Sequence, residues 1–249
     1  MAQPDTIDPP GLLTRLRILA GQVADWLTVI AMSGMAFVLA DRVLPPQALP
    51  WKPLRPEQSV GRPIRPRVEN PAQDPAICRG ILTQGGVSFQ DVPDRTDGNF
   101  CALNGAMVVT GGVVTLKPVG AVMACEEALA YAMWERQVVQ PAAMELLGSP
   151  VVGIDHYGAY VCRTRYGMAG QPPSEHATGN AVDIGAFHLQ DGRVISVEKA
   201  WSSPGADGQF VHRVRDGACK VFNGVLSPDY NAAHHNHLHL DMGQWAMCR

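Results

Sequence analysis

Hydrophobic positions divide the chain into three stretches. From Ile18 to Ala40 nearly every residue is apolar, and a helix needs about 20 such residues to cross a bilayer. Residues 45–77 are rich in proline and arginine and poor in apolar side chains, which favours an extended spacer over a packed core. In the remainder, short apolar runs alternate with turn residues. The pattern predicts a tail and membrane anchor at 1–44, a linker at 45–77 and one domain at 78–249.

The apolar run has two other interpretations. A cleaved signal peptide would show a small-residue cleavage site after a shorter run, and none is evident before Asp41. An uncleaved anchor is therefore favoured, although a buried core helix of a soluble protein would have a similar composition. Gln22 and Asp25 are polar, but both lie in the first third of the run, where they would reach the headgroup level. Basic residues flank both ends, so they do not fix the orientation.

Within the domain, the periodicity predicts both strands and helices. Helical spacing of apolar residues predicts helices at 123–147 and 209–226. Alternating or short β-type runs predict strands at 85–89, 106–110, 151–154, 159–163, 181–189, 193–197 and 237–241. The strands at 151–154 and 159–163 are predicted to form a hairpin with its turn at Tyr157-Gly158. The strands at 181–189 and 193–197 are predicted to form a second hairpin with its turn at Asp191-Gly192. This mixture indicates an α+β domain.

Charge and cysteine content narrow the classes of partner and compartment. The net charge is -3, so there is no basic excess to neutralise nucleic-acid phosphates, and no nucleic acid is expected as a partner. The six cysteines are all in the predicted domain and include no CxxC pair. Their even number fits structural disulfides in an oxidising compartment, which places the domain outside the cytoplasm. Buried free thiols in a cytosolic protein are the alternative.

The pairing of these cysteines is left open by the sequence, because six cysteines allow many connectivities. Pairing between neighbours along the chain is our expectation. It gives the disulfides Cys78–Cys101, Cys125–Cys162 and Cys219–Cys248.

Two polar motifs are the main chemical feature of the domain. His176 is followed after six residues by Asp183, which has an apolar neighbour on each side, and His237-Leu238-His239 lies far downstream. On a strand both imidazoles of the second motif point to one face, and Asp183 points to a cleft while its neighbours turn to the core. A catalytic zinc site needs three nitrogen or oxygen ligands and one open position. His176, Asp183 and one histidine of the second motif would supply them, unless the spacing is incidental.

The spacing Ser-x-His-x6-Asp, beginning at Ser174, with a distant His-x-His resembles the LAS metallopeptidases. These comprise D-Ala-D-Ala carboxypeptidases and lysostaphin-like peptidoglycan hydrolases. Over roughly Cys78 to Arg249 the sequence also resembles the extensin-like C-terminal family of bacterial proteins. Three segments carry this closer likeness: Gly158–Arg163, Ser174–Phe187 and Asp229–His234. The resemblance implies an α+β fold with a LAS metallopeptidase-like antiparallel sheet and flanking helices, preceded here by one N-terminal transmembrane helix.

The resemblance also implies roles for the histidines. In the LAS pattern the second histidine of His-x-His binds zinc, which makes His239 the third ligand beside His176 and Asp183. The first histidine, His237, then acts as the base or stabilises the oxyanion. Another branch of the superfamily uses Glu-x-x-His with glutamate as the base, but that position is Asn236 here, so the His-x-His branch is the better match.

Substrate-binding roles follow less directly. Arg163 matches by position an arginine that precedes the motif in related peptidases, and it would bind the oxyanion or a substrate carboxylate. Arg165 is equally close to the motif, and for either arginine a solvated strand residue is the alternative. Ser174, the first residue of the motif, is a further candidate for substrate binding.

The implied activity is that of a zinc metallopeptidase with one Zn²⁺ ion. Its substrate would be the peptide part of peptidoglycan, cleaved as an endopeptidase or carboxypeptidase. The apolar run and the cysteines imply a single-pass inner-membrane protein with its catalytic domain in the periplasm. A non-catalytic cell-wall-binding module and a structural envelope protein are the alternatives, and neither requires the complete ligand set.

Overall fold

The computed structural model describes residues 11–44, 49, 52 and 74–249. The chain divides into two compact units, Met1–Leu49 and Pro50–Arg249. Most of the predicted linker at 45–77 lies outside the described residues, and the three-part division of the chain stays a prediction.

The first unit contains one long helix, α1 (Leu12–Val43). Its segment Leu19–Val43 is long and apolar enough to cross a membrane, although a signal sequence near the N-terminus passes the same test. Apolar side chains along it are exposed, with Trp26 at 68% and Met35 at 73%. The alternative of a buried core helix does not fit this exposure.

The second unit contains a ten-stranded sheet and a separate two-stranded one. The strands are β1 (Ser88–Asp91), β2 (Arg95–Asp97), β3 (Cys101–Leu103), β4 (Met107–Gly111), β5 (Thr115–Lys117), β6 (Ala121–Met123), β7 (Val151–Gly158), β8 (Ala181–Leu189), β9 (Val194–Ser196), β10 (Gly224–Leu226), β11 (Leu238–Asp241) and β12 (Met247–Cys248). The large sheet has the order β1-β4-β5-β7-β8-β11-β10-β12, with β6 beside β4 and β9 beside β8. Its pairs are antiparallel except β5 with β7 and β10 with β12.

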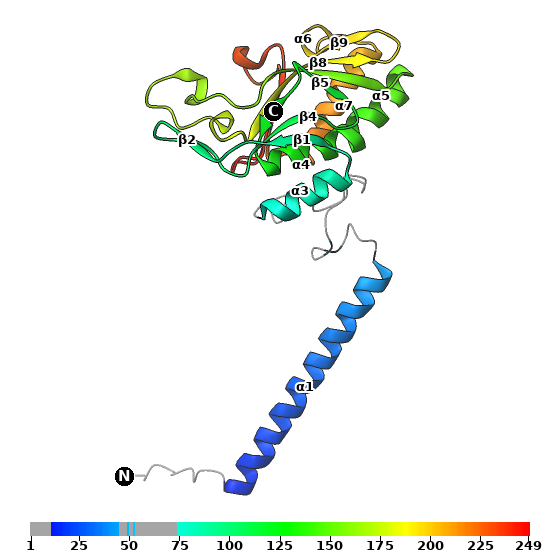
Figure 1. The fold of residues 1–249 in the computed structure, drawn as a ribbon. Helices are drawn as coiled ribbons and strands as arrows, with labels where there is room; N and C mark the ends of the chain where they lie inside the picture. The colour runs from blue at the N-terminus through cyan, green and yellow to red at the C-terminus, as the bar shows by residue number, and fades with distance from the viewer. Residues whose placement is uncertain (1–10, 45–48, 50–51, 53–73) are drawn as a thin grey trace, which may run out of the picture. The chain divides into compact units, whose positions relative to one another are not determined.

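Helices accompany this sheet, so the second unit has a mixed α+β fold (Figure 1). The α-helices are α3 (Pro75–Gln84), α4 (Cys125–Trp134), α5 (Gln140–Leu147), α6 (Val197–Ala200) and α7 (Ala206–Ala218). The predicted helix at 123–147 is confirmed as α4 and α5 joined by a π-helical segment, η2 (Glu135–Val139). It ends at Gly148, whose left-handed backbone (φ 68°) closes the last turn.

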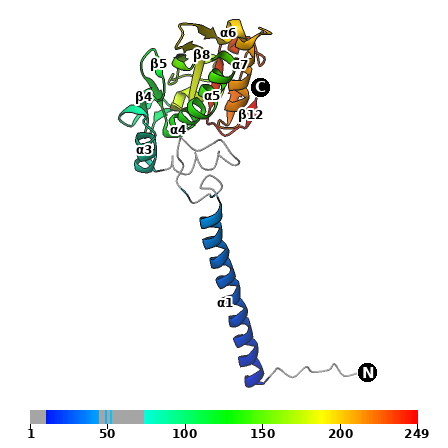
Figure 2. The same cartoon turned by 90° about the vertical axis from the view of Figure 1, so that its right-hand side faces the viewer.

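One hydrophobic core joins the helices to the sheet. The fully buried Trp134 lies at its centre, with ring centroids 6.1 Å from Phe187 of β8 and 6.3 Å from Phe222. Its indole N–H donates to the carbonyl of Val214 in α7 over 2.9 Å, so the polar atom of this large side chain is satisfied. Helices α4, α5 and α7 lie along one side of the sheet (Figures 1 and 2).

Alternation along β8 sorts its side chains between this core and the other face of the sheet. Val182 and Ile184 are fully buried in the core, while Asp183 between them is not part of it. Leu238 and Leu240 of β11 are buried in the same way on either side of His239. The predicted alternation is therefore confirmed, and the polar residues gather on the face turned away from the core.

Two predicted elements differ in the structure. The hairpin at 151–163 is wrong, because β7 runs through Gly158 and pairs with β5 and β8 instead of turning back. The helix predicted at 209–226 ends earlier, since α7 stops at Ala218 and residues 224–226 form β10 between β11 and β12. The hairpin predicted at 181–197 is confirmed as β8 and β9, with Gly192 at a left-handed φ of 91°.

Three disulfides use all six cysteines. The expected pair Cys219–Cys248 is confirmed, but the other two expected pairs are wrong. The structure joins Cys78 to Cys125 and Cys101 to Cys162, with Cα atoms 6.3 and 5.5 Å apart. Pairing between neighbours fails because the fold places α3 against α4, so that Cys78 meets the start of α4 instead of β3.

Candidate metal centre

Asp183 and His239 are direct cross-strand partners in the antiparallel pair β8 and β11. Because both point away from the core, their side chains meet, with His239 Nδ1 2.9 Å from Asp183 Oδ1. Neighbouring strands place opposite side chains close together on one face. The alternation in the two motifs is therefore enough to bring this pair together.

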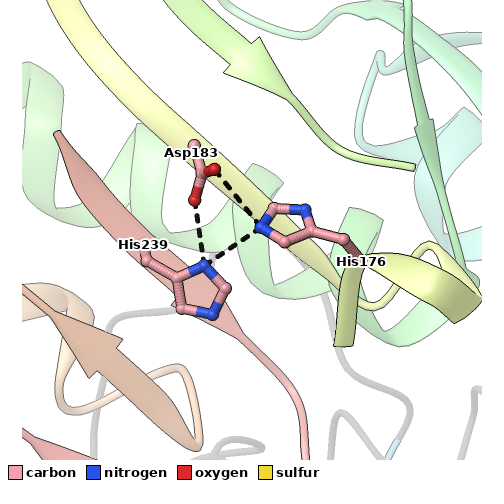
Figure 3. A group of neighbouring side chains, drawn as sticks. All are labelled: His176, Asp183 and His239. Atoms are coloured by element: carbon pink, nitrogen blue, oxygen red, sulfur yellow. Dashed lines mark hydrogen bonds and ion pairs between the residues drawn. The ribbon is translucent and has the colours of Figure 1, made fainter. Parts of the chain in front are cut away.

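His176 joins them from a 3₁₀ turn, η4 (Glu175–Thr178), that precedes β8. The turn ends at Gly179, whose left-handed backbone (φ 69°) leads the chain into the strand. His176 Nε2 lies 3.3 Å from Asp183 Oδ2 and 3.2 Å from His239 Nδ1 (Figure 3). The structure thus brings together the three residues that the sequence predicts as ligands.

The three ligand atoms lie close enough to share one cation. All of them are within 4.8 Å of one another, and the nearest atoms of each pair are 2.9–3.3 Å apart. Ligands about 2.0–2.2 Å from a tetrahedral ion lie roughly 3.3–3.6 Å apart. Two imidazole nitrogens and one carboxylate therefore fit a divalent ion with little movement, and leave one tetrahedral position for another ligand.

His176 is oriented by the backbone. Its Nδ1–H donates to the carbonyl of Ala159 over 2.8 Å, which leaves Nε2 directed at Asp183 and His239. Histidine ligands are commonly fixed through their other ring nitrogen in this way. Ala159, which supplies this carbonyl, directly follows Gly158, the last residue of β7.

The charges of this cluster are strongly coupled. Burial alone would raise the pKa of Asp183, but hydrogen bonds from His176 and His239 outweigh it and hold the pKa well below the usual carboxyl range. Burial alone would lower the pKa of His239, but its bonds to Asp183 and Asp241 raise it to about 9. Without a cation, His239 is therefore protonated at neutral pH and Asp183 is ionised.

His237 lies beside the cluster and is not one of the three closest groups. Its Nε2 is 3.5 Å from Asp183 Oδ1, and its Nδ1–H donates to the side-chain carbonyl of Asn236 over 2.8 Å. Burial lowers the pKa of His237 below its ordinary value. Its Nε2 is thus an unprotonated acceptor at neutral pH, next to the place where a metal would lie.

His234 forms the neighbouring wall of the site. It lies in the 3₁₀ turn η5 (Ala232–His234) before β11, with its ring centroid 5.2 Å from that of His237 and 5.8 Å from that of His239. Burial, together with the positive charge of the neighbouring His239, lowers the pKa of His234 to about 4. A neutral ring packed against the cluster excludes solvent from it without adding charge.

The cluster opens into a pocket of about 460 Å³, within the usual range for a ligand site. Arg163, Arg165 and Ser174 all line it. The backbone N–H of Ser174 donates to the carbonyl of Arg163 over 3.1 Å, which joins the two ends of the exposed loop at 163–174. The three predicted substrate-binding residues therefore lie in the same pocket as the ligand cluster.

The loop carries a tyrosine that sequence reasoning did not identify. Tyr166 has a left-handed backbone (φ 56°), the one described non-glycine residue with a positive φ. Its hydroxyl accepts from Asn231 Nδ2 at 3.2 Å, and its hydrogen bond to the hydroxyl of Tyr230 raises the pKa of Tyr230. Strain in a non-glycine backbone concentrates at functional sites, and both tyrosines line the pocket.

Three carboxylates near the cluster also escaped the sequence analysis. Asp241 hydrogen-bonds His239, and Glu175 lines the pocket and accepts from Asn180 Nδ2 at 3.4 Å. Glu127 in α4 is fully buried, and neither of its carboxylate oxygens has a hydrogen-bond partner among the described residues. Burial, with the nearby charges of Asp241 and Glu175, raises the pKa of Glu127 well above its ordinary value. Of these three carboxylates only Asp241 had a signal in the sequence, because it lies two residues after His239 and so on the same face of a strand.

The remaining histidines lie outside the cluster, and three of them have hydrogen-bond partners elsewhere. His156 Nε2 is 2.8 Å from the carbonyl of Pro118, and His212 Nε2 is 3.0 Å from the carbonyl of Trp201. His188 is paired with Asp155 at 2.7 Å. His235 lies before β11 and is exposed.

The fold and the site together define a mixed α+β domain with a His–Asp–His cluster inside a ligand-sized pocket. The profile of one protein family, described as "Extensin-like protein C-terminus", matches residues 76–249. Because the match covers most of the chain, the protein belongs to this family. No match was found among curated proteins or among solved structures.

Proposed function

We propose that this protein is a zinc-dependent hydrolase that cleaves peptide bonds in peptidoglycan. The single observation that carries the proposal is the convergence of His176, Asp183 and His239 within bonding distance of one ion. Two histidines and a carboxylate, with a fourth position open, are the ligand set of catalytic zinc sites. The sequence resemblance to LAS metallopeptidases, with the order His, Asp and His along the chain, points to the same chemistry.

A zinc ion in such a site supplies Lewis acidity and lowers the pKa of a bound water towards ~7. Asp183, ionised across the neutral range, would balance part of the charge of the ion. Asp183 would hold the ion together with His176 and His239, and all three residues line the pocket that a substrate would enter.

His237 is the candidate general base. Its Nδ1–H is donated to Asn236, so its Nε2 lone pair faces the cluster. A buried, neutral imidazole at this place can take a proton from the attacking water as oxygen adds to the amide carbonyl. The same proton then passes to the leaving nitrogen as the C–N bond breaks. Asn236 thus acts as an orienting residue in the position where another branch of the superfamily has a glutamate base.

The pocket suits a peptide with a negative charge near the cleaved bond. Arg163 and Arg165 both line the pocket and bring two positive charges to it. One of them would bind the developing oxyanion and the other a substrate carboxylate. Peptidoglycan stem peptides carry carboxylates, which fits this arrangement and the resemblance. Ser174 joins the two ends of the loop that carries both arginines.

The same proposal places the protein in the cell envelope. Helix α1 would be a single span of the inner membrane, and three disulfides favour a periplasmic domain because they persist in oxidising compartments. A reporter enzyme that works only outside the cytoplasm should be active when it is fused after Arg249. A reporter that is active only in the cytoplasm would contradict this topology.

Digestion of purified peptidoglycan tests the activity. The full chain in detergent, loaded with zinc, should release peptides whose masses identify the bond cleaved. H176A and H239A should lose metal and activity together, since each removes a ligand. H237A should keep the metal but lose turnover by about 10²-fold or more.

His235→Ala is the matched control, because His235 lies in the same histidine-rich segment but is exposed and outside the cluster. It should behave as wild type in both assays. If wild type binds zinc and binds peptidoglycan without releasing anything, the protein is a non-catalytic cell-wall-binding module. If it binds neither, the proposal is wrong and a structural role in the envelope takes its place.

A further inference from the structure

We propose that Asp241 is a positioning residue that fixes the ring of His239, so that Nδ1 and not Nε2 is presented to the metal. This inference rests on the proposed metal centre. Asp241 belongs to neither polar motif, and its role would be to act through His239 without touching the ion or the substrate.

The first observation is the pair of contacts made by the His239 ring. Nε2 lies 3.1 Å from Asp241 Oδ2, and Nδ1 lies 2.9 Å from Asp183 Oδ1. A neutral imidazole has one N–H and one lone pair. With the N–H donated from Nε2 to Asp241, the lone pair is on Nδ1, which faces Asp183 and His176.

The second observation is that the Asp241 carboxylate is itself held in place. Its Oδ1 accepts the backbone N–H of Gly243 over 2.8 Å, while Oδ2 faces His239. Its two oxygens therefore have separate partners, and the side chain is nearly buried, at 9% exposed. A carboxylate bound at both oxygens cannot swing towards the cation.

The third observation is that small neighbours on both adjoining strands leave room for this carboxylate. The cross-strand partners of Asp241 are Ala181 on β8 and Gly224 on β10. A methyl group added to Gly224 would overlap the carboxylate of Asp241, with Oδ2 2.0 Å away. The glycine at this place on β10 is thus required by the Asp241 carboxylate.

Asp241 is poorly suited to the alternative role of a fourth metal ligand. Its Oδ2 contacts Nε2, the nitrogen on the far side of the His239 ring from Asp183 and His176. The group of ligand atoms within 4.8 Å of one another contains His176, Asp183 and His239, without Asp241. A carboxylate that hydrogen-bonds a histidine ligand orients the ring and increases its basicity. Loss of such a carboxylate commonly weakens metal binding roughly 10–100-fold.

The two histidine ligands differ in a way that makes the proposal testable. His176 is fixed by the backbone carbonyl of Ala159, which no substitution removes. His239 is fixed by a side chain, so D241N should affect one ligand and leave the other as it was. The matched control is D155N, because Asp155 pairs with His188 at 2.7 Å outside the pocket.

The experiment measures zinc affinity of the full chain by competition with a chromophoric chelator at fixed pH. D241N should bind zinc roughly 10–100-fold more weakly than wild type, and D155N should match wild type. Imidazole ¹⁵N signals of the zinc-loaded wild type should show the His239 proton on Nε2, in a slowly exchanging hydrogen bond. In D241N this proton should exchange faster.

Each outcome separates the two proposals. If wild type binds zinc and D241N binds it within about twofold of the same affinity, the role of Asp241 is wrong and the metal centre stands. If wild type carries the His239 proton on Nδ1, the role of Asp241 is also wrong, and this measurement needs no variant that folds. If wild type binds no zinc, the proposed function fails and the role of Asp241 falls with it.

Discussion

The side-chain amide of Asn231 donates to the hydroxyl of Tyr166 over 3.2 Å. This contact connects the exposed loop at 163–174 to the segment before β11, across the pocket that both line. The same hydroxyl also hydrogen-bonds the hydroxyl of Tyr230 in that segment, while other bonds of the loop are internal, such as Arg165 N–H to the carbonyl of Pro172. The Tyr166 hydroxyl therefore ties the loop that carries Arg163 and Arg165 to the segment before β11.

Removal of this hydroxyl tests the importance of the loop. Y166F should raise KM for peptidoglycan peptides several-fold with little change in kcat, since about 1 kcal/mol of lost positioning is roughly a fivefold change. The free energy of unfolding should change by less than about 0.5 kcal/mol, because the loop is exposed. Y160F is the control, as its hydroxyl donates to Asp97 at 2.6 Å outside the pocket. Equal KM values for the two variants would contradict the prediction.

The charge state of His239 predicts a pH dependence of metal binding. Without metal its pKa is raised to about 9 by Asp183 and Asp241 against the effect of burial, so zinc must displace a proton from it below that pH. The zinc affinity should therefore increase about tenfold per pH unit from neutral pH up to about pH 9 and then level off. Asp183 contributes no such proton, because its pKa is well below its usual range. Chelator competition at several pH values measures the slope, and an affinity that is constant across this range would refute the prediction.

Glu135 predicts a pH dependence of stability that is separate from the metal centre. Burial raises its pKa to about 7, although its carboxylate accepts the N–H groups of Val113 and Val114 at 3.0 and 2.9 Å. The folded state then binds more protons than the unfolded one between the ordinary carboxyl pKa and about 7. The free energy of unfolding should fall as pH rises through this window, by about 3 kcal/mol from this group.

Glu135→Gln isolates that effect. Denaturant unfolding at about pH 4 and pH 8 should show wild type losing about 3 kcal/mol more than E135Q between the two. Because the glutamine does not titrate, the gap in the free energy of unfolding between the two proteins should shift in favour of E135Q as pH rises through this window. A gap that stays constant with pH would show that Glu135 has an ordinary pKa in the folded state.

The disulfide Cys101–Cys162 predicts a link between redox state and the pocket. Cys162 directly precedes Arg163, and its partner lies 61 residues away in sequence. The double variant C101A/C162A should lose about 2–4 kcal/mol of stability and also activity, because the start of the pocket loop is released. C219A/C248A, which opens a disulfide of separation 29 away from that loop, should lose stability with less effect on activity. The same loss of activity in both would argue that only global stability matters.

Much of the site follows from local alternation. An apolar residue on each side of Asp183 and of His239 predicts two strands with inward-facing neighbours, and the structure places the polar pair on one face. The position of His176 could also be predicted, because it lies in the turn-rich segment just before β8 and is therefore close to Asp183. What the sequence does not contain is the pairing of β8 with β11, which depends on contacts between residues more than fifty positions apart.

The errors have the same origin. Tyr157-Gly158 looks like a turn, but β7 stays paired with β8 as far as Gly158, which lies opposite Asp183, and tertiary pairing overrides local propensity. Residues 224–226 look helical by apolar spacing, yet they pair with β11. Asp241 has no visible partner in the sequence, since its role depends on a ring two residues away and on Gly224 across the strand.

The placement of the ligands on β8 and β11 has a mechanical consequence. An ion bound by Asp183 and His239 would act as a removable cross-link between two central strands, and it would close a loop that contains α7 and the whole connection between them. The Cys219–Cys248 bridge closes a second loop that overlaps the first. With both in place, neither strand could leave the sheet without the other, so the loaded protein would open slowly and resist proteases. Chelation would remove the first of these two cross-links while the disulfide and every other covalent bond stayed intact.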